Sequence, residues 1–376
     1  MFYFLPYVTM TCFLGICAYI HGMTDDTVYK NRATIVSVVV FYIFFAFRGY
    51  IFSDWTNYYP FFYECSIQDI TNYKFGDVEP GFTLLNLLCR SIFEDFHFFV
   101  FICTTINLFL LIRFLRNRVS NIPLALMLFF CFEGVMIMTN LMRNSISILL
   151  FLNAITYLVK RQPVQYYALC LLALLFHYSA FLYFFVYLFF HIRFSKWIYL
   201  AIFVGCNVIF IIHFSVFQLI ISAIGFDTSV IEKLDIYTAE ASKNTIFSIG
   251  YLERLATGLL IFCYYEKLQN MREENAVYIN AILFYFAFFF LFSEFDIFSK
   301  RLALLFVFGY WILWYDLIKC FSIESNRFLF QLFIGCYCIL KIAGINYPDA
   351  EYDNVLWGIK SYEERLYLYN KNFKEN

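Results

Sequence analysis

The stretch Thr139-Asn140-Leu141-Met142-Arg143-Asn144-Ser145-Ile146-Ser147 places an arginine among uncharged polar residues, directly before the apolar run Ile148-Leu149-Leu150-Phe151-Leu152. If the stretch forms one helix, Asn140, Arg143, Asn144 and Ser147 fall at positions i, i+3, i+4 and i+7 and share one face. A cation on such a face of a membrane helix is expected to contact protein or a water-filled cavity, and not lipid. The stretch therefore predicts a functional site with an anionic partner.

The composition of the rest of the chain is that of a membrane protein. Of its 376 residues, 62% are hydrophobic and only 15% are charged, and apolar runs long enough to cross a bilayer recur along its length. We expect an all-α, polytopic transmembrane helical bundle, with residues 1–376 forming a single membrane domain. The net charge of -1, without a basic tract or a glycine-rich phosphate loop, argues against nucleic acid as a partner.

Hydropathy predicts about twelve membrane spans. Their expected ranges are Phe2–Ile20, Ala33–Phe47, Phe96–Leu115, Ile122–Met138, Leu141–Val159, Val164–Phe176, Tyr178–Ile192, Trp197–Phe214, Ile249–Tyr265, Ala276–Ser293, Leu302–Ile318 and Phe328–Ile345. The longer segments outside these ranges are predicted to be external: a loop at 48–95, a second loop at 215–248 and a C-terminal tail at 346–376.

The distribution of cations predicts how the spans are oriented. Lysine and arginine recur in alternate connections, which is typical of segments on the cytoplasmic side. These cations are Lys30, Arg32, Arg113, Arg116, Arg118, Lys160, Arg161, Arg193, Lys196, Lys267, Arg272, Lys319 and Arg327. Both termini are then expected outside the cytoplasm.

This orientation brings several isolated polar residues to the external side. At about 1.5 Å per helical residue, Arg143 lies about 25 Å from Lys160, and His177 about 24 Å from Arg161. Both distances approach the roughly 30 Å thickness of the hydrocarbon core, so Arg143 and His177 are expected at a similar outer depth. Three further arginines are expected to approach the same external cavity: Arg48, Arg254 and Arg301.

Each of these residues also has a structural alternative that the sequence leaves open. Arg143 could snorkel or cap the carbonyls of a neighbouring helix, and Arg48 and Arg301 could be ordinary anchors at the membrane interface. Asn144 and His177 could make structural hydrogen bonds between helices. The remaining alternatives are a local ion pair between Glu253 and Arg254 and solvated loop carboxylates at Asp54 and Glu79.

A set of short motifs, spread in order over nearly the whole chain, resembles a known family. The motifs are Phe47-Arg48-Gly49, Ser53-Asp54-Trp55-Thr56-Asn57-Tyr58, Glu79-Pro80-Gly81-Phe82, Met142-Arg143-Asn144-Ser145-Ile146, Leu175-Phe176-His177-Tyr178-Ser179-Ala180 and Lys300-Arg301-Leu302-Ala303. Together they look like those of the EpsG family of Wzy-like polysaccharide polymerases.

The resemblance implies a bacterial inner-membrane enzyme whose active site faces the periplasm or the cell exterior. Such enzymes polymerise oligosaccharide repeat units carried on undecaprenyl diphosphate, moving the growing glycan to the non-reducing end of the next lipid-linked unit. They are similar in architecture to the helical membrane glycosyltransferases called GT-C, and they need no cofactor and no metal. The implied partners are the lipid-linked oligosaccharide, membrane lipid, and a chain-length regulator and flippase of the same pathway.

The candidate residues suit this reaction for physical reasons. The departing diphosphate gains negative charge, which fixed guanidinium groups stabilise. We therefore expect Arg143 and Arg301 to bind the diphosphate, with a contribution from Arg48 or Arg254. His177 is a candidate general base, because an unperturbed histidine titrates near 6.5, but a protonated phosphate ligand is equally compatible. The candidates for binding the acceptor or substrate are Asp54, Asn144 and Glu79.

Three other classes of protein remain open at this point. A glycan ligase would use the same chemistry with a different acceptor. A flippase of the same lipid-linked unit would also need helices and a cationic cavity, but it is expected to show internal repeats, and none is evident. A membrane acyltransferase would need its donor at the cytoplasmic face, whereas the polar residues are expected outside.

Overall fold

The computed structural model describes residues 2–216, 219, 248–293 and 296–373, and within these ranges the elements are all helices. The prediction of a polytopic helical bundle is confirmed. The chain divides into two compact units, Met1–Leu188 with Phe328–Asn376, and Phe189–Arg327. Each unit is described by itself. Most of the predicted loop at 215–248 lies outside the described residues.

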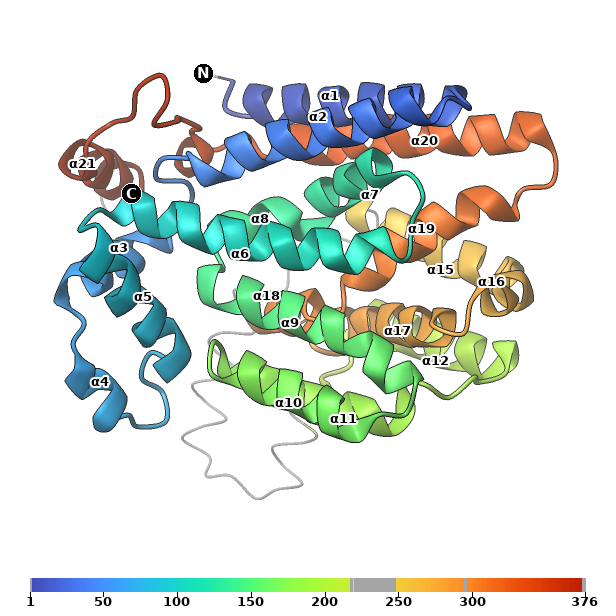
Figure 1. Cartoon of the computed structure of the whole chain (residues 1–376). Coiled ribbons are helices and arrows are strands. Elements are labelled where there is room, and N and C mark those ends of the chain that lie inside the picture. Colours follow the sequence, from blue (N-terminus) through green and yellow to red (C-terminus); the bar gives the residue numbers. More distant parts are fainter. Residues whose placement is uncertain (1, 217–218, 220–247, 294–295, 374–376) are drawn as a thin grey trace. The chain divides into compact units, whose positions relative to one another are not determined.

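Six helical segments among the described residues are long and apolar enough to cross a membrane, and all six contribute to the first unit. They are α1 (Leu5–Met23), α2 (Thr27–Ala46), α6 (Phe96–Arg116), the segment Ile122–Thr139, α9 (Met142–Val159) and α20 (Glu324–Ala343). Helix α1 packs against α2, α2 against α6, and α6 against α9 (Figure 1). Aspartates begin two of these helices, since Asp26 accepts the Val28 N–H and Asp95 accepts the Phe98 N–H.

The segment Ile122–Thr139 is bent in the middle. It consists of α7 (Ile122–Phe129), a π-helical turn, η1 (Phe130–Gly134), and α8 (Val135–Thr139). Inside the turn Glu133 has φ of 66°, a left-handed conformation that is uncommon for a residue with a side chain. Its carboxylate lies 3.5 Å from the Lys341 ammonium of α20. The bend thus places an ion pair within an otherwise apolar segment.

A second break separates α8 from α9, and it corrects the prediction of one continuous polar face. Leu141 has φ of -104° and ψ of 49°, outside the helical region, and α9 begins only at Met142. Asn140 therefore does not share a helix with Arg143. Its side-chain oxygen instead accepts the backbone N–H groups of Ser53 and Asp54 at 3.2 and 2.8 Å. These contacts supply a physical reason for the break, since they hold Asn140 toward the segment after α2.

The predicted external loop at 48–95 contains three helices. They are α3 (Trp55–Glu64), α4 (Ile67–Thr71) and α5 (Pro80–Ile92). The Arg90 guanidinium of α5 donates to the carbonyls of Phe62, Tyr63 and Cys65. These bonds satisfy carbonyl acceptors at the C-terminal end of α3, which have no partner within the helix. The segment is therefore a small folded layer on the first unit.

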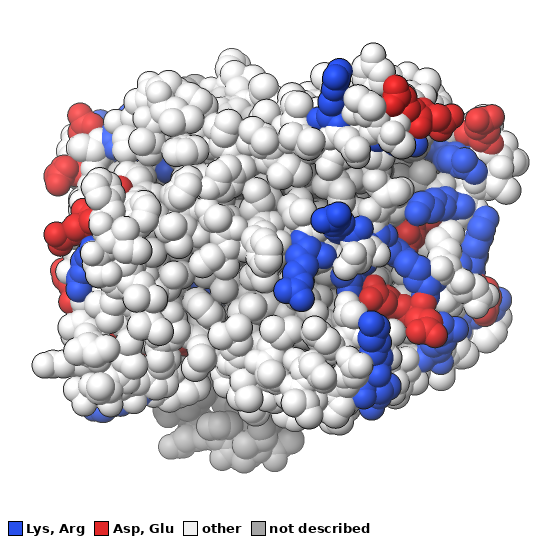
Figure 2. Space-filling view, viewed as in Figure 1, with Lys and Arg blue, Asp and Glu red and all other residues white. Residues whose placement is uncertain are grey.

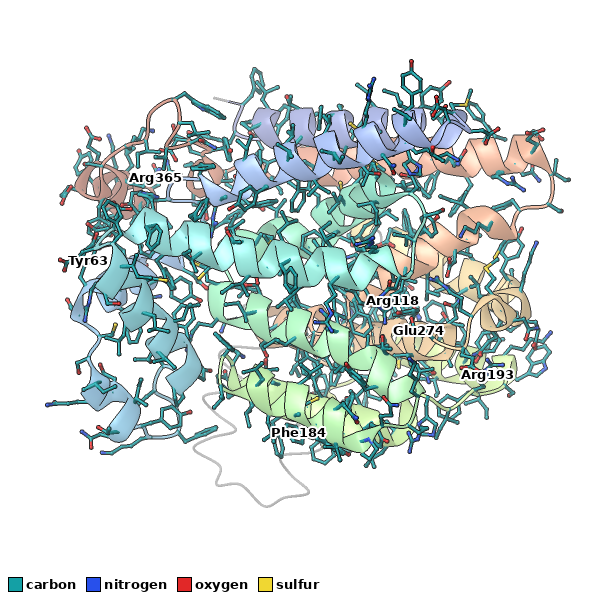
Figure 3. The ribbon with its side chains drawn as sticks, in the orientation of Figure 1. Tyr63, Arg118, Phe184, Arg193, Glu274 and Arg365 are labelled. Atoms are coloured by element: carbon teal, nitrogen blue, oxygen red, sulfur yellow. The ribbon has the colours of Figure 1, made fainter. Side chains whose placement is uncertain are left out.

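The C-terminal tail is also folded. It carries the short helix η3 (Pro348–Ala350) and α21 (Tyr362–Phe373). Gly49 donates its N–H to the Asp353 carbonyl and Phe52 donates to the Asp349 carbonyl, so the tail pairs with the segment that leaves α2. Arg365 of α21, labelled in Figure 3, is buried and donates to the Tyr50 carbonyl at 3.0 Å.

After α9 the first unit continues with α10 (Pro163–Leu174), the turn η2 (Tyr178–Ala180) and α11 (Phe181–Phe189). Helix α10 packs along α9. Within the first unit, α6 and α9 run in the same direction and α2 runs against them (Figure 1). The basic residues at the start of α2 and at the ends of α6 and α9 consequently lie at one end of these helices, as Figure 2 shows for the visible surface of α6 and α9.

The second unit is built around α17 (Asn275–Leu291). This helix packs against four others: α12 (Lys196–Ile211), α16 (Tyr265–Met271), α18 (Asp296–Leu304) and α19 (Phe308–Cys320). Helix α15 (Ile249–Cys263) packs against α12. The predicted span Leu302–Ile318 is wrong as a single helix, because a turn separates α18 from α19. In this turn the N–H groups of Leu305, Phe306 and Val307 each donate to the carbonyl three residues earlier.

Candidate functional site

An ion pair between Arg143 and Glu79 lies at the centre of the candidate site. The Arg143 Nη1 donates to Glu79 Oε2 at 2.7 Å, and the side chains are 26% and 2% exposed. The other carboxylate oxygen of Glu79 accepts the backbone N–H of Tyr178 at 3.0 Å. Glu79 therefore joins three elements that are distant in sequence: α5, α9 and η2.

The position of Glu79 follows from how α5 begins. Glu79 immediately precedes α5, and Pro80 occupies its first turn, where its missing N–H leaves nothing unsatisfied. The next residue, Gly81, donates its N–H to the Leu175 carbonyl at 2.8 Å. A Cβ atom at Gly81 would lie 2.7 Å from that carbonyl oxygen, so only glycine allows this approach. The Glu-Pro-Gly sequence thus fixes α5 against the end of α10.

Arg143 occupies the second position of α9, where the positive end of the helix dipole adds to its own charge. Its buried Nε–H has no hydrogen-bond partner among the described residues. Part of the side chain stays exposed, so a ligand can approach it from that side. A phosphate oxygen at the exposed part of this side chain would be attracted by the guanidinium and by the positive end of the helix dipole.

Tyr58 and Asp54 belong to the same neighbourhood. Burial raises the pKa of the Tyr58 phenol to about 12, Asp54 adds to the rise, and the Arg143 guanidinium opposes it. Asp54 precedes α3, and its position is fixed by the contact of its N–H with Asn140. Asp54, which we predicted as a substrate-binding residue, is thus held close to the Arg143 ion pair.

His177, Ser179 and Asn144 form a chain of polar contacts beside the ion pair. The His177 Nδ1 lies 2.7 Å from Ser179 Oγ, and Ser179 Oγ donates to Asn144 Oδ1 at 3.2 Å. Since that donation uses the only hydroxyl proton of Ser179, the 2.7 Å contact then requires a proton on Nδ1 of His177. In the other tautomer Nδ1 accepts the Ser179 backbone N–H at 3.2 Å, and His177 caps η2.

Arg48 is placed away from this cluster. Its side chain is buried, and its Nη1 donates to the Phe45 carbonyl at 2.8 Å and to Thr104 Oγ1 at 3.2 Å. Its backbone pairs with Asn354 of the tail. Burial lowers the pKa of the guanidinium to about 10, which leaves it charged at neutral pH. These contacts join the Arg48 guanidinium to α2 and α6, and the side chain is almost fully buried.

The other two predicted arginines belong to the second unit. Arg254 donates to the Gly250 carbonyl and to the Tyr285 hydroxyl, and its guanidinium lies 3.7 Å from the centre of the Phe289 ring. Arg301 is exposed on α18. That Arg301 and Arg143 reach one diphosphate stays a prediction.

Two contributors to the site were not singled out from the sequence. Ser179 lies within the quoted motif around His177, so its spacing of two residues was a usable signal for a local side-chain contact. Tyr58 had no such signal, because 23% of the chain is aromatic and one tyrosine does not stand out. Across the described ranges, no group of three or more His, Cys, Asp and Glu side chains has the arrangement of a metal site.

Comparison with known proteins identifies one family. The family model described as EpsG family matches residues 31–355, which include every candidate site residue. Neither a curated relative nor a solved structure matches the chain.

Proposed function

The chain belongs to the EpsG family, whose members are Wzy-like polymerases, and from this premise we propose that it polymerises lipid-linked oligosaccharide repeat units. The substrate class is an oligosaccharide on undecaprenyl diphosphate. The growing glycan leaves its carrier and joins the non-reducing end of another carrier-bound unit. The helical bundle is compatible with an architecture like that of GT-C glycosyltransferases.

The Arg143–Glu79 pair carries this proposal. The sugar–phosphate bond breaks with its electron pair moving to the phosphate oxygen, so the departing diphosphate gains a negative charge. A guanidinium already oriented by a buried carboxylate needs little reorganisation to stabilise that charge. The start of α9 supplies further N–H donors for phosphate oxygens.

His177 is suited to accept the proton of the attacking sugar hydroxyl. With its proton on Nδ1, the ring donates to Ser179, and Ser179 donates to Asn144. In this tautomer Nε2 is the ring nitrogen that would take the hydroxyl proton as the new glycosidic bond forms. Asn144 acts here through Ser179 and His177, as a positioning residue.

The remaining candidates take different roles. Glu79 was a candidate for binding the acceptor, but both of its oxygens accept protein donors, so we assign it the orientation of Arg143. Asp54 remains the candidate for binding the acceptor sugar. Arg301, exposed on α18, remains the second candidate for the diphosphate, while Arg48 and Arg254 are left out because protein groups hold their guanidiniums.

We place the protein in the bacterial inner membrane, with the Arg143 site and both termini outside the cytoplasm. The support is the location of the basic residues in the first unit. Lys30, Arg113, Arg116 and Lys160 lie at one end of α2, α6 and α9, whereas Arg143 begins α9 at the other.

Incubation of the purified protein with lipid-linked repeat units alone tests the proposal. We expect a ladder of glycans that differ by one repeat unit. A single product formed only when a second acceptor is added would identify a ligase. Movement of the unit across vesicle membranes without bond formation would identify a flippase, and either result would overturn the polymerase assignment.

A further inference from the structure

A groove of about 830 Å³ runs along the outside of the first unit, between α2 and α6. Its walls are mainly apolar, with Val38 and Val39 from α2 and Leu108, Phe109 and Ile112 from α6. Val39 is 48% exposed and Phe109 is 64% exposed. Both helices are candidate membrane spans, so the groove lies where hydrocarbon chains surround the protein.

The two ends of the groove differ. At one end the Tyr42 hydroxyl lies 2.7 Å from Thr105 Oγ1. Thr105 already donates to the Phe101 carbonyl, so Tyr42 is the donor, and the pair bridges α2 and α6. At the other end Arg113 and Arg116, both exposed and three residues apart on one side of α6, line the mouth of the groove.

The length of the groove matches one leaflet of a bilayer. From Thr105 to Arg116 the helix rises about 17 Å, roughly half of the hydrocarbon thickness of about 30 Å. A molecule that fills the groove therefore has an anionic head at the level of the arginines and an apolar tail that ends near Tyr42. An ordinary boundary lipid would need neither the hydrogen-bonded Tyr42–Thr105 pair at one end nor the two guanidiniums at the other.

We infer that this groove binds one anionic phospholipid of the leaflet in which α6 ends, with its phosphate between Arg113 and Arg116 and an acyl chain along Val38, Val39 and Phe109. Basic pockets between membrane helices are known to select anionic head groups. The inference does not depend on the polymerase proposal, because the groove lies at the opposite end of α6 and α9 from Arg143.

Native mass spectrometry of the full chain in detergent, with phosphatidylglycerol or phosphatidylcholine added, tests the inference. We expect preferential retention of phosphatidylglycerol. The R113Q/R116Q variant should bind phosphatidylglycerol about 30-fold more weakly, because each cation contributes a factor of about five. Val39→Trp, an exposed substitution that fills the groove, should reduce the retention of phosphatidylglycerol even with both arginines present.

The matched control removes the same charge elsewhere. R193Q/K196Q acts on the connection before α12, where Arg193 is labelled in Figure 3, and it should retain phosphatidylglycerol as the unmodified protein does. The inference fails if this control loses as much lipid as R113Q/R116Q, since the effect would then be one of total charge. It also fails if Val39→Trp leaves retention unchanged, or if the two phospholipids bind equally.

Discussion

Arg143 differs from a simple surface cation because a buried carboxylate fixes its Nη1 while part of its side chain stays exposed. Glu79 holds Nη1, while Nε–H is unpaired among the described residues and the side chain is a quarter exposed. The planar fork of arginine can satisfy both sides at once, whereas lysine presents a single charged point. The identity of the cation therefore matters as much as its charge.

Arg143→Lys should keep the protein folded and lower the rate of polymer formation about 10²- to 10³-fold, the usual effect of losing one oriented donor to a developing anion. The measurement is the initial rate of glycan-ladder formation from lipid-linked units. Arg193→Lys, at an exposed position, is the control and should polymerise at the normal rate. Normal chain growth by Arg143→Lys would remove Arg143 from the mechanism.

His177→Asn separates the chemical role of His177 from its structural one. An asparagine oxygen can still accept the Ser179 N–H and cap η2, so the thermal midpoint should stay near that of the unmodified protein. Without a ring nitrogen to take the proton, the rate should fall about 10²- to 10⁴-fold. If instead His177→Asn polymerises normally while His177→Ala unfolds at lower temperature, His177 is only a cap.

Ser179→Ala tests whether the chain from His177 to Asn144 orients the base. Removal of the hydroxyl should lower kcat, with little change in the KM for the lipid-linked unit, and should shift the acidic limb of the pH–rate profile. A loss of stability with an unchanged pH profile would assign Ser179 to packing alone.

At the scale of elements, the approach of α5 to the end of α10 determines whether Glu79 reaches Arg143. Gly81→Ala would place a Cβ 2.7 Å from the Leu175 carbonyl oxygen and 2.9 Å from its Cβ. We expect a loss of about 1–3 kcal/mol in the free energy of unfolding and a fall in polymer yield. Gly335→Ala in α20, where nothing lies within 4 Å, is the control and should be neutral or slightly stabilising.

Hydropathy predicted where helices occur, but not where they break. Each of the twelve predicted ranges overlaps a helix. The break at Leu305–Val307 lies in apolar sequence, and the break at Leu141 lies between Asn140 and Arg143. Neither of these positions carries glycine or proline, so the usual helix-breaking residues do not mark them. At Leu141 the cause is a contact between Asn140 and residues almost ninety positions away, which a local pattern cannot contain.

The same limit explains the outcome for individual site residues. The motifs around Glu79, Arg143 and His177 were recognisable in the sequence, and the structure brings all three into one cluster. Arg48 carried an equally good motif, yet it is covered by residues near Asn354. The charge of an arginine and its depth in the membrane can be predicted from sequence. Hydrogen bonds that its guanidinium donates to other parts of the chain cannot.

At the scale of the whole molecule, the folded tail ties the C-terminal part of the first unit to the segment that leads into α3. Burial tends to raise the pKa of the Glu351 carboxyl, but contacts with Lys360 and Arg365 outweigh it and lower the pKa below its ordinary value. Burial raises the pKa of the Asp349 and Asp353 carboxyls. When the pH falls, protonation of Glu351 therefore destabilises the folded tail, whereas protonation of Asp349 and Asp353 stabilises it.

The tail should loosen in acid through Glu351. A carboxyl with a lowered pKa in the folded state contributes stability that is complete above its ordinary value of 4.5 and is lost as pH falls through the lowered pKa. Hydrogen exchange of the α21 amides between pH 7 and pH 3 measures this. In Glu351→Gln the effect of acid should reverse. The α21 amides should become better protected as the pH falls, because protonation of Asp349 and Asp353 then dominates. Equal acid loosening in both proteins would exclude Glu351 as the cause.

The pairing of the tail with the segment after α2 also has a consequence for biosynthesis. Arg365 contacts Tyr50 across 315 positions of sequence, so the partner of that early segment leaves the ribosome only after every span of the first unit has been translated. Until then the backbone around Gly49 and Phe52 lacks its acceptors. Folding of this region of the protein therefore waits for translation of the tail, and a nascent chain that stops before α21 would lack the contact between Arg365 and the segment that leads to Asp54.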